Sequence, residues 1–149
     1  TLLITDALIV SSADQQFAIP QSNVEEVLQI EEANVRRIEQ AELVSVRGAA
    51  LPLIRLRRLF GFAASEKPMP SVLVSESERG RVGLVVDRIM GQRQVVVRSL
   101  RDPLIQVPGV IGATDLGNGR PLLILDPVAL ARQNIHTKNE LPSGNERRS

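Results

Sequence analysis

The sequence contains no cysteine, tryptophan or tyrosine, and its 149 residues include one histidine and three phenylalanines. The absence of cysteine excludes disulfides, thiol catalysis and thiolate metal sites. The single histidine, His136, lies in a polar tail, so a zinc site is disfavoured as well. Because aromatic residues make up only 2% of the chain, its core must be built from Leu, Ile and Val, and the β-branched members of this set favour strands.

The chain also lacks an excess of charge and a long hydrophobic run. Its 18 basic and 17 acidic residues give a net charge of +1, which provides no global attraction to nucleic acid or to an anionic membrane. No apolar run approaches the roughly 18 residues of a membrane-spanning helix. The opening TLLITDALIV has no signal-peptide features and no methionine, and it begins inside a strand pattern. We therefore expect this chain to be a piece of a longer protein.

Short strands joined by turns dominate the first half of the sequence. Leu2–Val10 and Phe17–Pro20 flank a polar turn and predict a hairpin. Val35–Ile38 and Leu43–Val46 predict another pair, whereas Asn23–Ile30 fits helical and strand spacing equally. A glycine turn and a strand follow in RGAALPLI, and RLRRLFGF predicts a short helix that ends at a glycine.

The second half repeats this style. SVLVSES, RVGLVVDRI and QVVVRSL predict strands, with a tight turn at Glu78–Gly80. GVIGATDLGNGRPLLIL predicts a hairpin around Gly-Asn-Gly, and Asp126 is typical of the N-cap of a short helix whose first residue is Pro127. The polar tail over 136–149 predicts disorder.

A weak internal repeat relates the two halves. The spacing Gly48, Leu51, Leu53, Ile54 and Leu59 matches Gly119, Leu122, Ile124, Leu125 and Leu130, and FAIPQSNV resembles VGLVVDRI. Each half therefore predicts one small antiparallel barrel ending in a helical turn. We expect approximate subdomains at 11–65 and 66–132 within a domain of residues 1–135, with the N-terminal strand shared. Strands alternating with long helices are absent, so a doubly wound fold is disfavoured.

A search for chemistry finds no catalytic motif. The glycine-rich LGNGR leads into a strand rather than a helix, which favours a hairpin turn over a phosphate loop. Asp87 ends an apolar strand, but no His and no carboxylate lies near it in sequence, so we favour a structural role over a general base. A rival hypothesis is an enzyme with a divalent metal held by Asp87, Asp115 and Asp126.

The arginines form two clusters, at Arg36 and Arg37 and at Arg55, Arg57 and Arg58. Nucleic-acid binding would also need interleaved aromatic side chains, which are missing. A solvated face, or a docking rim for an acidic partner, is the preferred interpretation. A barrel-type nucleic-acid binder is the third hypothesis, and it predicts steeply salt-dependent binding.

Several long motifs, in this order, resemble the CheW-like domain of bacterial chemotaxis signalling. They are QQFAIPQSNVEEVLQI, VRGAALPLIRLRRLFG, GLVVDRIMGQRQVVVRSL and VPGVIGATDLGNGRPLLILDPVAL, and the resemblance covers about residues 1–132. Within the family, Arg55 in LPLIRL and GQRQVVVRSL are more similar to the regulatory domain of the histidine kinase CheA than to the free-standing adaptor CheW. The adaptor remains the alternative.

The resemblance implies an all-β fold of two tandem SH3-like five-stranded barrels with pseudo-twofold symmetry and short helices. It also implies a non-catalytic domain without cofactor, metal or catalytic residues. Its expected partners are the CheW adaptor, the cytoplasmic tip of chemoreceptors and the other domains of the kinase, with no nucleic acid and no membrane insertion. The expected location is the cytoplasm, at the membrane through receptor arrays.

Two docking surfaces follow as hypotheses. Small barrels expose strand edges and apolar patches that can pair with partners. Apolar residues in two segments of the first half are candidates for adaptor docking: Val24, Val27, Leu28, Ile30, Leu43 and Val46. The same residues could instead form the core, and that alternative stays open here. Ile89, Met90 and Val110 are candidates for a groove between the barrels that takes a receptor helix.

Overall fold

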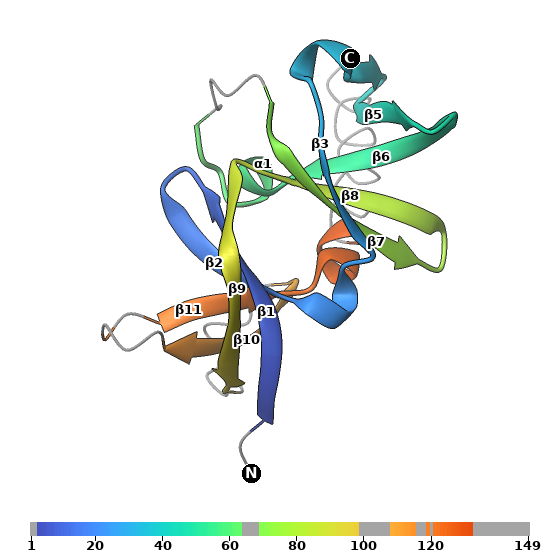
Figure 1. Ribbon diagram of the computed structural model, residues 1–149. Coiled ribbons are helices and arrows are strands. Elements are labelled where there is room, and N and C mark those ends of the chain that lie inside the picture. The colour runs from blue at the N-terminus through green and yellow to red at the C-terminus, as the bar shows by residue number, and fades with distance from the viewer. Residues whose placement is uncertain (1–2, 64–68, 99–107, 116–118, 120, 133–149) are drawn as a thin grey trace, which may run out of the picture.

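The computed structural model describes residues 3–63, 69–98, 108–115, 119 and 121–132. These residues form short strands and a few helical turns (Figure 1). The strands are β1 (Leu3–Ser12), β2 (Gln15–Pro20), β3 (Glu26–Gln29), β4 (Arg36–Ile38), β5 (Ala41–Val46), β6 (Ala49–Arg55), β7 (Ser71–Ser77), β8 (Gly80–Val86), β9 (Arg88–Val97), β10 (Val110–Asp115) and β11 (Pro121–Leu125). The helical segments are η1 (Gln21–Asn23), η2 (Glu32–Asn34), α1 (Leu56–Leu59) and a last helix over 127–132.

The first barrel is the sheet with strand order β10-β11-β2-β1-β9, which lies in the lower part of Figure 1. Its two end strands meet, because Arg98 and Ala113 exchange both backbone hydrogen bonds at N–O distances of 2.8 and 2.9 Å. Gly112 permits this approach, since a Cβ at this position would lie 2.9 Å from the carbonyl oxygen of Arg98. The sheet is therefore closed, which leaves no free edge at this seam.

The second barrel is the sheet with strand order β3-β7-β8-β6-β5-β4. β3 and β4 are consecutive in sequence and are separated only by η2. Together they occupy the place that the continuous strand β9 has in the first barrel, and the pair Arg36–Leu43 between β4 and β5 corresponds to the Arg98–Ala113 bridge. The predicted all-β fold of two five-stranded barrels is thus confirmed, with one closing strand broken in two.

The sequence repeat corresponds to equivalent strand pairs. β6 runs parallel to β8 with Leu53 opposite Gly83, and β11 runs parallel to β2 with Ile124 opposite Ala18. Leu53 matches Ile124 in the repeat, and Gly83 matches Ala18, so the two registers are the same. This equivalence is the pseudo-twofold relation that the sequence predicted.

The barrels do not follow the expected division into 11–65 and 66–132. The hairpin β1–β2 belongs to the first half of the sequence but pairs with β9 and β11 of the second half. The hairpin β7–β8 in turn pairs with β3 and β6 of the first half. The repeat identifies two similar sequence units. In the structure each unit contributes a hairpin to the barrel that contains most of the other unit's strands, so neither barrel comes from one unit alone. A hairpin is stable only when further strands pair with it. A sequence repeat does not show whether those strands come from the same unit or from the other one.

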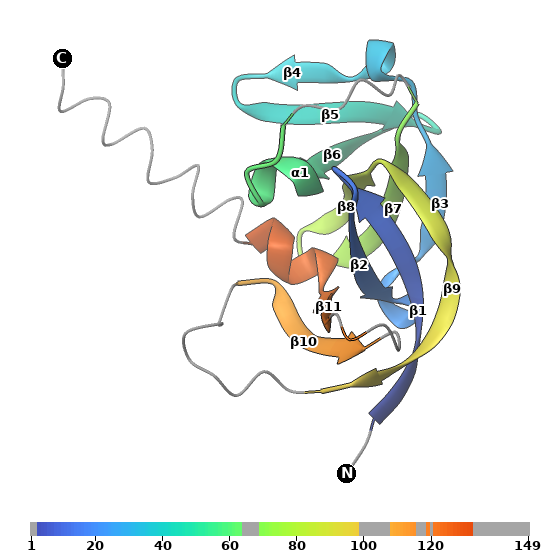
Figure 2. The ribbon, with the colours of Figure 1, turned by 90° about the vertical axis from the view of Figure 1, so that its left-hand side faces the viewer.

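Hydrophobic side chains form three clusters that tie this arrangement together. One fills the second barrel and includes Ile30, Val44 and Leu51, and another lies in the first barrel. The largest joins the barrels, with Phe17 and Ile19 from one, Ile54 and Leu84 from the other, and Leu130 of the last helix. Figure 2 shows that helix, in orange, between the two barrels. A shared core of this kind holds the barrels as one unit.

The segment 23–30, for which helical and strand spacing were equally possible, contains β3 and only the last residue of η1. Two other local predictions are confirmed. The short helix α1 ends before Gly61, whose φ is +72°. Asp126 caps the last helix by accepting a hydrogen bond from the Val128 N–H at 3.0 Å. Most of the Gly-Asn-Gly turn and the polar tail with His136 lie outside the described residues. Within the described ranges, no helix has the length and hydropathy to cross a membrane.

Candidate functional site

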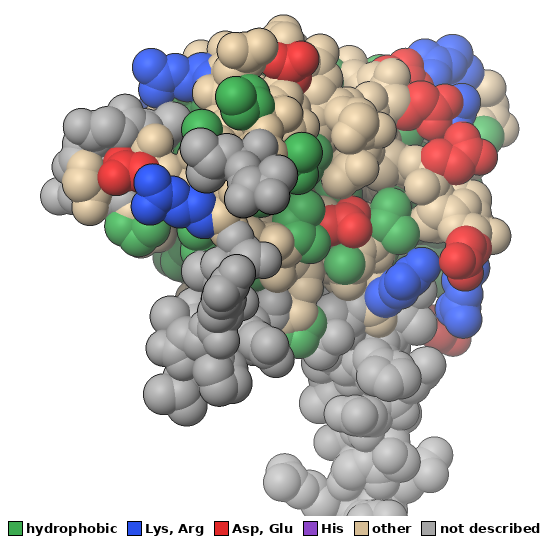
Figure 3. Space-filling model, turned by 90° about the horizontal axis from the view of Figure 1, so that it is seen from below, with side chains coloured by type: hydrophobic (Ala, Val, Ile, Leu, Met, Phe, Trp, Pro, Cys, Tyr) green, Lys and Arg blue, Asp and Glu red, His purple; other side chains and the backbone are tan. Residues whose placement is uncertain are grey.

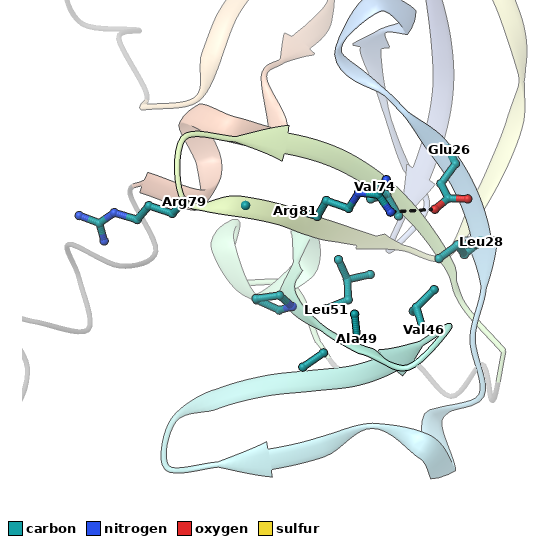
Figure 4. A pocket seen from close by; sticks show the side chains of 11 residues that line it. Glu26, Leu28, Val46, Ala49, Leu51, Val74, Arg79 and Arg81 are labelled. Carbon is teal, nitrogen blue, oxygen red and sulfur yellow. Dashed lines mark ion pairs between the residues drawn. The ribbon is translucent and has the colours of Figure 1, made fainter.

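A groove of about 330 Å³ opens at the end of the second barrel. β3, the β5–β6 hairpin and the β7–β8 hairpin form its walls, and Leu28, Val46, Leu51 and Val74 form its apolar floor. Figure 4 shows the side chains of Val46 and Leu51 on one side of the groove and Leu28 on the other. Such a concave apolar surface can receive a hydrophobic side chain of a partner.

Charged side chains surround the groove. Arg47, in the β5–β6 turn, forms an ion pair with Glu26 on β3. Arg81 pairs with Glu25 at 2.6 Å and lies 3.8 Å from Glu26, the contact drawn as a dashed line in Figure 4. Arg79 also borders the groove and makes no ion pair within the described residues. The rim thus combines paired charges with one arginine that can meet a carboxylate.

The predicted adaptor-docking residues do not lie on one surface. Leu28 and Val46 line the groove, and Val27 points from the opposite face of β3 with 46% of its surface exposed. Ile30 is only 6% exposed in the second-barrel cluster, so it is a core residue. The remaining two are half-buried. Val24 packs against the cluster between the barrels, and Leu43 lies in β5 opposite Arg36.

The predicted receptor-groove residues do not share one surface. Ile89 and Val110 both pack against the cluster between the barrels. Met90 is exposed and lines a shallow hollow of about 300 Å³ on the first barrel, beside Ile9 and Arg93. This hollow lies where β9 passes the β1–β2 hairpin, the place equivalent to the groove of the second barrel. Its walls are more polar, with two glutamines among its lining residues.

Hydrophobic side chains are also exposed at the far end of the first barrel. Figure 3 shows green side chains on this face, among acidic and basic ones. Leu3 and Ile4 at the start of β1 and Ile111 on β10 are exposed by 63, 61 and 48%, respectively. Sequence reasoning did not select these residues, because β1 and β10 show the ordinary alternation of side chains that is typical of a half-buried strand.

Asp87 lies at the junction of the two barrels, where the chain passes from β8 to β9. One carboxylate oxygen accepts a hydrogen bond from the Ala13 N–H at 2.9 Å, in the turn of the first-barrel hairpin. The other forms an ion pair with Arg57 of α1 at 2.6 Å. The Asp87 N–H donates to the carbonyl of Ser11 at 2.9 Å. These contacts agree with the structural role expected for Asp87.

Within the predicted basic cluster, Arg57 is buried and Arg55 is half-buried, which corrects the expected solvated face at these two positions. Arg57 is 10% exposed at its side chain, and Arg55 is 15% exposed in ion pairs with Glu32 and Glu42. Arg36, Arg37 and Arg58 are exposed as expected. Sequence reasoning missed the ion pairs of Arg55, because its partners Glu42 and Glu32 lie 13 and 23 residues away in the chain.

Metal binding by Asp87, Asp115 and Asp126 has no support in the described ranges. No group of three or more His, Cys, Asp or Glu side chains there is placed to hold a metal ion. Asp87 is engaged between the barrels and Asp126 caps a helix.

Comparisons with known proteins identify the family to which the sequence is similar. The sequence model of the CheW-like domain family matches residues 6–134. The chain is 39% identical to chemotaxis protein CheA of Rhizobium meliloti over 134 residues, which are 87% of this chain and 18% of that protein. It is 35% identical to CheA of Treponema pallidum over 85% of the chain and 16% of the relative. The chain therefore spans less than a fifth of the length of these two relatives.

Among solved structures, the fold resembles the scaffolding protein TtCheW from Thermoanaerobacter tengcongensis. The TM-score is 0.70, and the match covers 86% of this chain and 92% of that one. Sequence identity is only 17%, so this likeness supports the fold alone. The two-barrel architecture thus agrees with that of a solved structure.

Proposed function

Because the chain belongs to the CheW-like domain family, we propose that it is the regulatory and scaffolding domain of a bacterial chemotaxis histidine kinase. The observation that carries this proposal is its identity of 32 to 39% to chemotaxis kinases over most of its own length. In this role the chain has no catalytic residues of its own. It docks the CheW adaptor and the cytoplasmic tip of a chemoreceptor, and so couples receptor state to kinase autophosphorylation in the cytoplasm.

The shared core supports such coupling. A partner that binds one barrel acts on a unit whose other barrel is joined to it by packed side chains and by Asp87. A displacement at one docking surface is therefore carried to the other barrel rather than absorbed in a flexible linker. The kinase domains would sense the combined position of both barrels.

We place adaptor docking on the second barrel. Leu28 and Val46 form part of the groove floor that receives an apolar side chain of the adaptor, and exposed Val27 adds apolar contact on the outer face of β3. Val24 and Leu43 contribute only their exposed parts, and Ile30 supports β3 from the core. Arg79 at the rim favours a partner with a nearby carboxylate.

Receptor contact is proposed at the first barrel and at its border with the second. Met90 lies exposed in a hollow there, while Ile89 and Val110 show a part of their surface beside the joining core. A receptor helix that covers these residues would bury apolar area next to the junction of the barrels. A receptor helix bound at this position would contact the joining core, so a change in the receptor could act on both barrels.

A matched pair of variants tests adaptor docking. Val27→Asp places a charge on β3, and Ile111→Asp places one at a side chain of nearly equal exposure, 46 against 48%, on the first barrel. We expect Val27→Asp to reduce adaptor capture at least tenfold, since a desolvated charge opposes burial, and Ile111→Asp to leave it unchanged. Both variants should keep the wild-type melting temperature. Loss of capture only in Ile111→Asp would move the site to the first barrel.

A free-standing CheW-type adaptor is the second candidate, because the fold covers 92% of the stand-alone scaffolding protein TtCheW. The two candidates differ in whether kinase domains are encoded in the same protein as this chain. Reading the gene on the N-terminal side of Thr1 distinguishes them. A kinase ATP-binding region encoded there supports the first candidate, and a start codon directly before Thr1 supports the adaptor.

A further inference from the structure

The hollow on the first barrel and the groove on the second lie at equivalent places. The strand orders β9-β1-β2-β11-β10 and β3-β7-β8-β6-β5 correspond one to one. Ile9 of β1 lines the hollow and lies opposite Ala18. Val74 of β7 lines the groove and lies opposite Gly83. Because Ala18 and Gly83 are equivalent positions of the repeat, the two concave surfaces can be compared residue by residue.

An arginine stands in the first barrel where the second has a leucine. Two residues beyond the pairing partner of Ile9, β9 carries Arg93. Two residues beyond the pairing partner of Val74, β3 carries Leu28. Side chains alternate along a strand, so Arg93 shares its face with Val95, which is only 3% exposed in the first-barrel core. Arg93 therefore lies on the core-facing side of β9, at the mouth of the barrel.

The guanidinium of Arg93 has no carboxylate partner within the described ranges. Arg93 is exposed and makes no ion pair there. The hollow is lined by Ile9, Gln16, Met90, Gly91, Gln92 and Arg93, and so by no acidic side chain. In the groove of the second barrel, by contrast, Arg81 and Glu26 lie 3.8 Å apart. An unpaired guanidinium in a concave surface is suited to a carboxylate, which it can hold with two parallel hydrogen bonds.

A β-bulge directs an apolar side chain to the same hollow. The register between β1 and β9 shifts between Ile9 and Val10, which leaves Met90 without a pairing partner on β1. Bulges re-aim the side chain of the extra residue, and Met90 exposes 49% of its surface where it lines the hollow. The hollow thus presents a cation and an apolar side chain together.

We propose that this hollow is a carboxylate-binding site, which docks an acidic side chain of a protein partner on Arg93. Met90 packs against an apolar neighbour of that acidic residue, and the Gln16 amide can donate a further hydrogen bond. The hollow has a volume of about 300 Å³, which suits one side chain. Both Arg93 and Met90 are exposed, so a partner surface is needed to cover them.

The inference rests on the proposed function only for the identity of the partner. That partner is the receptor tip, which we place at Met90. The chemistry of the hollow follows from its own residues, because the cation has no acid beside it in the part of the chain that the structure describes. The two parts of the inference can therefore be tested separately.

Arg93 has a competing interpretation as a guard of the barrel edge. Inward-pointing charges on edge strands deter unwanted pairing, and β9 stands last in the strand order of its sheet. A guard residue predicts no preference of the hollow for carboxylates. A binding site predicts such a preference and its loss when the guanidinium is removed.

Two small probes of nearly equal shape, 4-methylpentanoate and 4-methylpentanamide, test the chemistry without any partner. NMR titration of the chain reports binding through the backbone amide shifts of Gly91 and its neighbours. We expect dissociation constants on the order of 10 mM, with the carboxylate bound roughly threefold more tightly than the amide. Arg93→Leu should remove this difference. Equal affinities in the wild type, or a preference that survives in Arg93→Leu, overturn the proposal.

Arg88→Leu is the matched control. Arg88 is an exposed residue of the same strand, makes no ion pair among the described residues and does not line the hollow. Its removal changes the net charge by the same amount, so it should leave the preference for the carboxylate unchanged. An equal loss in both variants would show general attraction to a basic protein and would contradict the site. Circular dichroism checks that both variants are folded.

A receptor fragment that contains the cytoplasmic tip, from the same organism, tests the identity of the partner. Arg93→Leu should weaken its binding several-fold at low salt and less at high salt, since salt screens exposed ion pairs. Arg88→Leu should bind like the wild type. If Arg93→Leu also binds like the wild type, the receptor does not use the hollow and the proposal is overturned. A wild type that does not bind the fragment contradicts the proposed function, and the probe titration then decides the chemistry of the hollow.

Discussion

The two barrels share a topology but close their seams differently. In the first, β9 is continuous and its end is joined to β10 by two backbone hydrogen bonds between Arg98 and Ala113. In the second, the corresponding strand is broken by η2 into β3 and β4. Within the described residues β4 then pairs only with β5, and β3 forms one wall of the groove.

Side-chain charges hold the broken strand in place. The guanidinium of Arg55, on β6, donates to both carboxylate oxygens of Glu32 in η2 at 2.5 and 2.6 Å, and to Glu42 in β5 at 2.8 and 3.0 Å. These bonds raise the pKa of Arg55 above its ordinary value. Burial alone would raise the pKa of Glu42, but hydrogen bonds from Arg55 and the nearby positive charges lower it instead. A bidentate arginine therefore ties η2, at the break in the strand, to β5, in addition to the backbone pairing of β4 with β5.

The largest expected loss of stability comes from removing the ion pair that links the two barrels. Asp87→Ala leaves Arg57 buried without its ion-pair partner, and its Nη1 already has no hydrogen-bond partner among the described residues. We expect the free energy of unfolding to fall by about 3 kcal/mol, measured by urea denaturation. Glu78→Ala, which removes an exposed ion pair with Arg132, should change nothing measurable. Equal stability of the two variants would contradict the role of Asp87 as a junction.

A smaller loss of stability is expected from substitutions at two equivalent positions, where each barrel has a different small residue. A Cβ at Gly83 would lie 2.6 Å from Val72 Cγ1 and 3.0 Å from Leu53 Cδ2, whereas the first barrel has Ala18 there. Gly83→Ala should lower the free energy of unfolding by about 1 to 3 kcal/mol through overpacking. Ala18→Gly should cost about 1 kcal/mol through backbone entropy. Thermal and urea unfolding measure both, and a neutral Gly83→Ala would show that the second core relaxes freely.

The smallest expected effect is a pH-dependent contribution to stability from a carboxylate in the second barrel. Because folding lowers the pKa of Glu42 below its unfolded value of 4.5, its ionisation stabilises the fold above pH 4.5. This contribution is lost as the pH falls through the lower, folded pKa. Glu42→Gln cannot ionise, so its stability deficit relative to the wild type should be largest near pH 7 and shrink below pH 4.5. Urea unfolding across this range measures it, and a deficit independent of pH would contradict the account.

Sequence reasoning predicted the strands well because the hairpins are local. The alternation in β1 and β2, the polar turn between β4 and β5, and the cap at Asp126 each depend on neighbours in the chain. It also found the repeat between β6 and β11. It did not find the exchange of hairpins, because parallel partners such as Leu53 and Gly83 are far apart in sequence.

The candidate site was predicted only in part. Leu28 and Val46 do meet in one groove, but Ile30, just after β3 and two residues from Leu28, lies in the core, because alternation shows which residues share a face and not where along the strand that face is covered. The arginines Arg47, Arg79 and Arg81 at the groove were missed, because they come from two separate turns and strands. Charge patterns in sequence do not show which pairs meet across a barrel.

The sequence by itself determined the composition of the core, the short strands, their turns and the similarity of the two halves. These features follow from β-branched residues, glycine positions and period-two alternation, which act over a few residues. Only the tertiary structure decided that Asp87 joins the barrels, that Arg55 ties η2 to β5, and that β4 has β5 as its only strand partner within the described residues. The reason is physical: each of these depends on contacts between distant segments, and their geometry exists only once both barrels have closed.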